Sequence, residues 1–181
     1  QSHGWRAKCL QRLVRLQMPV PPTVALSFDA VRALAAGYPL DASALTDLLG
    51  PGKLICVRPS PENTEWGGPS AVLNIGMGEE CHNALSETHG REAADALYLR
   101  FVQAYAVNVA RLDPDMFESD MPTAEALRFA LRAYEDETDE PFPQGAERQL
   151  ADVLRSMSRA WEGTSARLLR QGKGGPGGAG R

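Results

Sequence analysis

Apolar residues along most of the chain recur at the three- and four-residue spacing of an amphipathic helix. The longest such pattern covers residues 91–112, where the apolar positions fall on one helical face. Two short apolar runs instead predict β-strands at 54–58 and 71–75, and a third, buried strand is expected at 23–27. Together these patterns predict a helix-rich α+β fold. The remaining expected helices cover residues 5–17, 27–36, 41–49, 123–134, 144–161 and 165–170.

Prolines and small polar residues mark where several of these elements begin and end. The proline-rich residues 18–22 must end the first helix, because proline lacks the amide hydrogen and restricts the residue before it. Either Ser27 or Asp29 is expected to cap the second helix, and either Asp41 or Ser43 the third.

Four further features interrupt the helical pattern. Residues 59–70 are rich in proline, glycine and serine and are expected to form a loop. Residues 135–140 contain five acids and are expected to be a solvated loop. Gly163 is expected to break a helix. Residues 172–181 hold six glycines and one proline, which predicts a flexible tail after a folded domain at 4–171.

Composition narrows the class of protein. The 181 residues suit one domain, within which residues 79–145 are expected to form a helical subdomain. The net charge of −4 argues against a nucleic-acid binder that works by electrostatic attraction. Three scattered cysteines do not form a disulfide framework, and no apolar run reaches the length of a membrane span. We therefore expect a cytoplasmic protein that binds neither nucleic acid nor membranes.

Two basic positions next to glycine suggest an anion site. Arg58 ends a predicted strand and precedes the glycine-containing loop around Gly67, so its guanidinium could hold a phosphate while nearby backbone amides approach it. Arg6 and Lys8 follow Gly4 at the start of a basic helix, where unpaired amides attract anions. The alternative for each is an ordinary solvated surface side chain.

The histidines and cysteines give weaker signals. His82 and His89 are seven residues apart, which does not suit a metal site on a helix, and both are expected at the surface. Cys9 and Cys56 lie in apolar patterns and are expected in the core. No metal site is predicted.

Several segments, taken together and in order, resemble the N-terminal nucleotide-binding region of pyruvate, phosphate dikinase and phosphoenolpyruvate synthase. The family's Gly-Gly-Lys-Gly-Ala-Asn-Leu and Leu-Pro-Val-Pro-Pro stretches are matched by GWRAKCL at 4–10 and MPVPP at 18–22. Its Val-Arg strand end and Val-Leu-Asn-Leu-Gly strand are matched by VRPS at 57–60 and VLNIG at 72–76. Its Phe-Pro-Gln turn is matched at 142–144.

This resemblance implies the first part of an ATP-grasp-type nucleotide-binding domain, without the second ATP-grasp half. By position, Arg6 replaces the family's phosphate-contacting lysine, Arg58 is its strand-end arginine, and Gly67 belongs to its phosphate-covering loop. Lys8 would support them. ATP is the cofactor that the resemblance implies, with Mg²⁺ only when a second half supplies its carboxylates.

Two functions follow as expectations. The first is binding of ATP or another phosphate ligand by a pseudoenzyme of kinase ancestry, without phosphoryl transfer by this chain alone. The alternative is a non-catalytic interaction or regulatory module derived from the same domain, whose protein partner supplies or replaces the missing half. Exposed tryptophans such as Trp5 and Trp66 would suit such a module.

Overall fold

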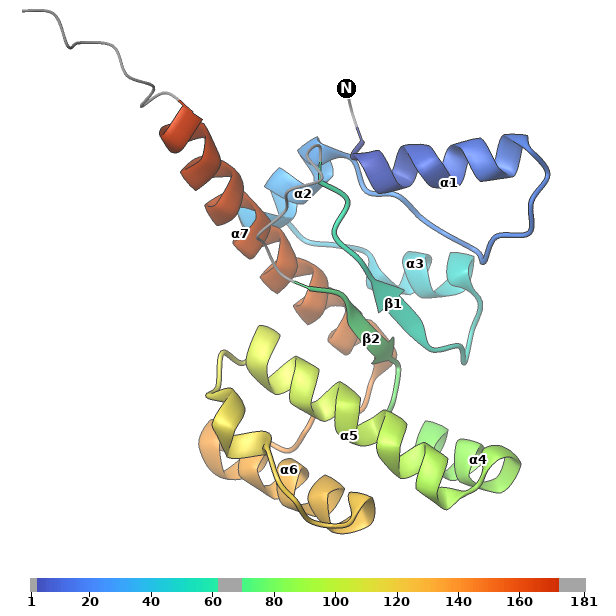
Figure 1. Ribbon diagram of the computed structural model, residues 1–181, viewed down its shortest axis with the longest axis vertical. Coiled ribbons are helices and arrows are strands. Elements are labelled where there is room, and N and C mark those ends of the chain that lie inside the picture. Colours follow the sequence, from blue (N-terminus) through green and yellow to red (C-terminus); the bar gives the residue numbers. More distant parts are fainter. Residues whose placement is uncertain (1–2, 62–69, 173–181) are drawn as a thin grey trace, which may run out of the picture.

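The computed structural model describes residues 3–61 and 70–172, which form a mostly helical α+β structure (Figure 1). Within these residues there are seven α-helices, one short 3₁₀ helix and one antiparallel pair of strands. In chain order the elements are α1 (Trp5–Arg15), α2 (Phe28–Ala35), α3 (Ala42–Leu49), β1 (Ile55–Val57), β2 (Val72–Ile75), α4 (Glu79–His89), α5 (Arg91–Asn108), η1 (Pro114–Phe117), α6 (Thr123–Thr138) and α7 (Ala146–Gly172).

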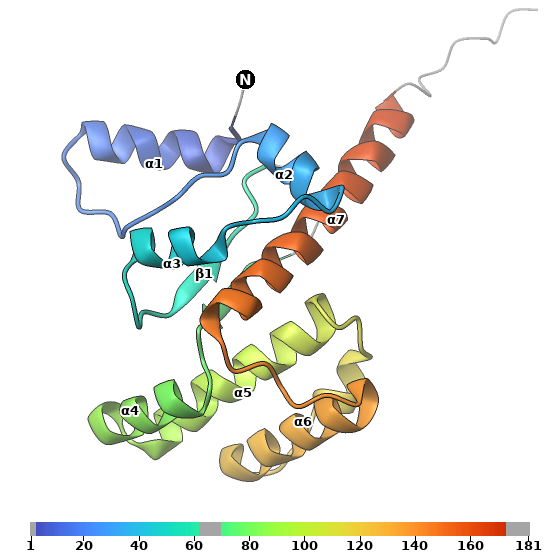
Figure 2. The same ribbon diagram turned by 180° about the vertical axis from the view of Figure 1, so that it is seen from behind.

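Two long helices, α5 and α7, organise the molecule around the small sheet. α5 packs against β2, α4, α6 and η1, whereas α7 packs against α2, α3 and both strands. Figure 2 shows α7 running between the α2–α3 side and the helices α4–α6. The core is continuous along this path and is formed by large apolar side chains of β2, α5, α6 and α7 such as Ile75, Phe101, Leu127 and Leu150. Phe142 packs at its centre against four aromatic rings of α5 and α6, those of Tyr98, Phe101, Tyr105 and Tyr134.

The strands pair as their apolar patterns predict. Ile55 lies opposite Ile75 and Val57 opposite Val72, with an irregularity between the two pairs. Ile55, Val72 and Ile75 are buried, while Cys56 faces solvent. In β1 the alternation follows from the two-residue period of a strand, whereas in β2 Val72 and Ile75, three residues apart, are both buried. The exposure of Cys56 corrects the expectation that it belongs to the core; Cys9 is only half-buried.

A buried glutamine links the sheet to α7. The amide nitrogen of Gln149 donates to the carbonyls of Met77 and Pro143 at 2.8 and 2.6 Å, and its amide oxygen accepts from Gly76 N–H at 2.7 Å. Gln149 is fully buried, so these three bonds satisfy backbone groups that water cannot reach. They fix the end of β2 against the start of α7.

The structure shows which of the alternative residues caps the second and the third helix. Ser27 accepts from the backbone of Ala30 and Asp41 from that of Ala44, so each is the N-cap of its helix. Asp29 instead forms an ion pair with Arg32 at 2.8 Å.

Three sequence predictions about elements are wrong. Residues 23–27 are not a buried strand: Thr23, Val24 and Ala25 are exposed and form no ladder. The acidic run is not a loop throughout, because α6 continues to Thr138. Gly163 does not break a helix, since α7 runs through it and is longer than α5.

Candidate functional site

The start of α1 is joined to the segment that follows β1. The amide of Trp5 donates to the carbonyl of Pro61 at 2.9 Å, and the amide of Ala7 donates to Ser60 Oγ at 3.1 Å. Gly4, the N-cap of α1, is buried directly on the backbone of Ser60. Residues more than fifty positions apart in the sequence therefore form one junction, which Figure 1 shows where α1 begins.

This junction brings two of the predicted phosphate-binding positions near each other along the backbone. Arg6 lies between the two bonded residues of α1, and Arg58 lies two residues before Ser60. Arg6, Lys8 and Arg58 are all exposed. None of the three forms an ion pair with a carboxylate of the described residues. The arrangement therefore leaves their charge open to an anion from solution.

The same bonds change the expected role of the helix N-terminus. The amides of Trp5 and Ala7 already have protein acceptors, and the amide of Lys8 bonds to Gly4 O within the helix. The expectation that unpaired amides at the start of α1 attract the anion is therefore wrong for these positions. Anion binding here would depend on side-chain charge, with the backbone serving to hold the side chains in place.

Arg58 extends from the strand end along the solvent side of β1. Its Nε donates to Cys56 Sγ at 3.3 Å, which places the guanidinium on the face of the strand that Cys56 presents to water. Arg58 directly follows β1, and it lies two residues after Cys56, a spacing that places both side chains on one side of an extended chain. The Arg58 side chain thus bonds to Cys56, whereas Ser60 and Pro61 form the junction with α1.

Two residues of the sequence hypothesis cannot be placed. Gly67, predicted in the phosphate-covering loop, and Trp66, predicted as an exposed aromatic, lie outside the described residues.

The segment matching Val-Leu-Asn-Leu-Gly has a structural role. Asn74 adopts a left-handed backbone with φ of 62°, and its side-chain amide donates to Leu97 O at 3.3 Å. Gly76 follows with φ of 106°, a conformation that favours glycine, and its amide bonds to Gln149. The asparagine and glycine of this segment therefore turn the chain from β2 into α4.

The structure also contains a hollow beside α1 that the sequence did not indicate. It has a volume of about 420 Å³ and lies between one face of α1 and the extended residues 20–25. Its lining is mainly apolar; the residues involved are Ala7, Leu10, Gln11, Val14, Val20, Pro21, Pro22, Thr23 and Ala25. The apolar spacing of residues 5–17 predicts the helix but not this hollow.

His82 is buried rather than at the surface, which corrects the prediction. Its Nε2 lies 2.6 Å from Asp95 Oδ1, and both side chains are buried between α4 and α5. Next to it, burial and the charge of Glu80 raise the pKa of the Cys81 thiol, which disfavours the reactive thiolate. Within residues 3–61 and 70–172, no three His, Cys, Asp or Glu side chains converge as a metal site would require.

Comparison with known proteins gives no family for this chain. A scan against protein-family models and a search of curated proteins both find no match. None of the helices in the described part of the chain is both long and apolar enough to cross a membrane. The dikinase resemblance therefore remains a prediction carried by the residues quoted for it.

Proposed function

We propose that this chain binds a phosphate-bearing ligand, with ATP as the first candidate, at the junction between α1 and the end of β1. Arg58 and Arg6 would contact the phosphates and Lys8 would add positive charge. The observation that carries the proposal is the pair of hydrogen bonds from Trp5 and Ala7 to Pro61 and Ser60. They join the two backbone segments that carry Arg6 and Arg58, and this supports a site to which both side chains contribute.

Binding without catalysis is the activity that we propose for the isolated chain. Phosphoryl transfer needs groups on both sides of the nucleotide and metal ions that neutralise its charge. In the dikinase-like reading, a partner chain carrying the second ATP-grasp half and its Mg²⁺ ligands would complete such a site. Alone, the chain would behave as a pseudoenzyme of kinase ancestry.

Calorimetric titration tests the proposal directly. ATP, ADP, inorganic phosphate and pyruvate would each be titrated into the full chain with and without Mg²⁺. We expect saturable ATP binding, competition by inorganic phosphate, and affinity at least roughly tenfold lower in Arg58→Ala, because a charged hydrogen bond contributes about 1.5–3 kcal/mol. Arg6→Ala should also weaken ATP binding.

A matched control separates this site from general charge effects. Arg128 is exposed on α6, at the other end of the molecule from α1 (Figure 1). Arg128→Ala removes the same charge and should leave ATP affinity unchanged. Absence of binding at millimolar ATP, or equal losses in Arg58→Ala and Arg128→Ala, would refute a phosphate site at the junction.

A second function, an interaction module without catalysis, is favoured by a different observation. α1 buries none of its residues, and Trp5, Val14 and Leu16 are each more than half exposed. A helix with several exposed apolar side chains is typical of a binding surface. Light scattering combined with size exclusion tests for assembly of the chain with itself or with a protein that co-purifies with it.

A further inference from the structure

The helix α1 is held at one end and lies otherwise at the surface. Its bonds to Ser60 and Pro61 involve only its first turn, and no other helix or strand in the described residues packs along it (Figures 1 and 2). An isolated helix of eleven residues is marginal in water, so its apolar side chains would normally be covered by another element. Here Val14 is 57% exposed and Leu16 63% exposed.

The hollow beside α1 is a groove in which such an element would fit. Ala7, Gln11 and Val14 follow one another at the spacing of one helical face and form one wall, with Leu10 beside them. Residues 20–25 form the opposite wall. The wall formed by α1 therefore offers apolar contacts over about two helical turns, which is the length that an amphipathic helix uses when it binds in a groove.

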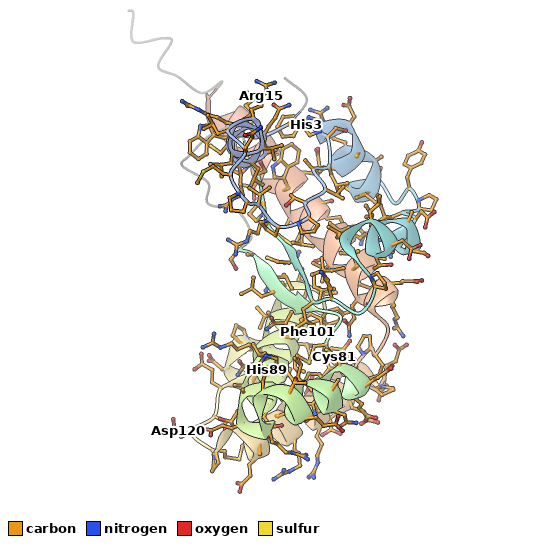
Figure 3. The ribbon with its side chains drawn as sticks, turned by 90° about the vertical axis from the view of Figure 1, so that its right-hand side faces the viewer. His3, Arg15, Cys81, His89, Phe101 and Asp120 are labelled. Carbon is orange, nitrogen blue, oxygen red and sulfur yellow. The ribbon has the colours of Figure 1, made fainter. Side chains whose placement is uncertain are left out.

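A basic stripe runs along this groove. Lys8, Arg12 and Arg15 each follow directly after a lining residue of α1, so they form the neighbouring row, turned by about 100° around the helix axis. All three are exposed, α1 contains no acid, and none of them has an ion-pair partner in the described residues. Figure 3, which looks along α1, shows Arg15 projecting away from the body of the molecule.

We propose that this groove binds an acidic amphipathic helix of a partner protein. The apolar face of that helix would lie against Leu10 and Val14, and its flanking carboxylates would pair with Lys8, Arg12 and Arg15. The charge of the stripe is complementary to acids and repels a basic partner. A groove between two walls accommodates a single helix, which can contact both walls at once.

This inference deepens the second candidate function by assigning it a surface and a partner chemistry. It shares only Lys8 with the proposed phosphate site, and the variants that test it replace Arg12, Val14 and Arg15, which do not belong to that site. Failure of the ATP titration would therefore leave it standing, and failure of the peptide experiment below would leave the phosphate site standing.

The test uses a designed peptide as the probe. A fluorescein-labelled 18-residue helix would carry Leu at positions i, i+3, i+4 and i+7, Glu on both flanks and Ala elsewhere, and its anisotropy would be followed on titration with the full chain. We expect saturable binding that is at least tenfold weaker for a scrambled peptide of the same composition and for a peptide with Lys in place of Glu.

Variants of the chain locate the binding surface. Val14→Asp and the double variant Arg12→Glu/Arg15→Glu should each weaken the peptide at least tenfold, and circular dichroism should show both folded because the three residues are exposed. The matched controls are Leu48→Asp on α3 and Arg128→Glu/Arg132→Glu on α6; these residues are also exposed, and the variants should bind the peptide normally.

Four results of the peptide, variant and vesicle experiments would overturn the proposal. They are no saturation with the acidic peptide, equal binding of the scrambled peptide, equal losses in the control variants, and binding of phosphatidylserine vesicles through Val14 in place of the peptide. Self-association of the chain that Val14→Asp abolishes would also refute an acidic partner helix, while preserving an interaction function for α1.

Discussion

Gly4 lies so close to Ser60 that a β-carbon at position 4 would overlap the Ser60 carbonyl group. The backbone of Gly4 itself is extended, with φ of −74°, so the glycine is required by the close approach and not by its own conformation. The contact involves backbone atoms on both sides, which cannot move away as a flexible side chain can. It therefore controls how α1 meets the end of β1.

Substitution of Gly4 by alanine should separate α1 from this junction. The added methyl group would push away the Ser60 backbone and break the bonds from Trp5 and Ala7, and overpacking of this kind costs about 1–3 kcal/mol. Hydrogen exchange should show faster exchange of the Trp5 and Ala7 amides, with the exchange of α5 amides unchanged. If the phosphate site is as proposed, ATP affinity should fall in the same variant. Unchanged protection of Trp5 would contradict the expected displacement.

The same substitution at Gly163 should have the opposite effect on stability. Gly163 lies inside α7 and is exposed, and a methyl group there would meet no described residue outside its own stretch of α7 within 4 Å. Glycine in a helix interior costs roughly 0.5–1 kcal/mol relative to alanine, because it loses more backbone entropy on folding. Gly163→Ala should therefore raise the free energy of unfolding by about this amount in urea. A lower stability would mean that α7 is not helical at this point.

The buried pair of His82 and Asp95 should contribute measurably to stability. Asp95→Ala would leave the His82 ring nitrogen without its 2.6 Å partner in a buried position, at a cost of about 1–3 kcal/mol. Urea unfolding of Asp95→Ala, His82→Ala and the double variant would give their coupling energy. Glu87→Ala is the control, since Glu87 is exposed on α4 and its loss should change stability by less than about 0.5 kcal/mol. Additive effects of the two substitutions would show that the pair contributes nothing.

Much of the fold was accessible from the sequence because its signals are local. The apolar runs at 54–58 and 71–75 predicted both strands, which the structure places at 55–57 and 72–75. Two alternative caps were predicted for each of two helices, and the side-chain bonds select Ser27 and Asp41. The predictions about burial failed where burial depends on contacts between distant parts of the chain. The expectation that Cys9 belongs to the core failed because apolar spacing predicts the helix α1 but not which elements pack on it, and no other helix or strand of the described residues packs along it.

The candidate site was only partly accessible for the same reason. Arg58 and Arg6 could be chosen as basic residues next to glycine or strand ends, but no local signal shows that Ser60 Oγ accepts from Ala7. That bond joins positions 53 residues apart. It also occupies the amide of Ala7, one of those that the sequence had suggested would bind an anion.

The stability of the fold should fall at alkaline pH, because the hydroxyl of Tyr105 is buried and donates to Asp152 Oδ2 at 2.8 Å. Burial, and next to it the hydrogen bond to the Asp152 carboxylate, raises the pKa of Tyr105 well above its usual range. Burial also raises the pKa of Tyr98 and Tyr134. In the unfolded chain tyrosine titrates near pH 10. Above about that pH the unfolded state has lost a proton that the folded state keeps, so the free energy of unfolding decreases as pH rises.

Urea unfolding at pH 8, 10 and 11 checks this pH dependence. Below pH 10 the contribution of Tyr105 should be complete, and Tyr105→Phe should cost about 1 kcal/mol there through the lost hydrogen bond. Above pH 10 the Tyr105→Phe variant should lose stability less steeply than the wild-type chain, since one titrating group is gone. Tyr38→Phe is the control, because Tyr38 is 67% exposed and its variant should follow the wild-type curve. Parallel curves for wild type and Tyr105→Phe would show that Tyr105 ionises alike in the folded and unfolded states.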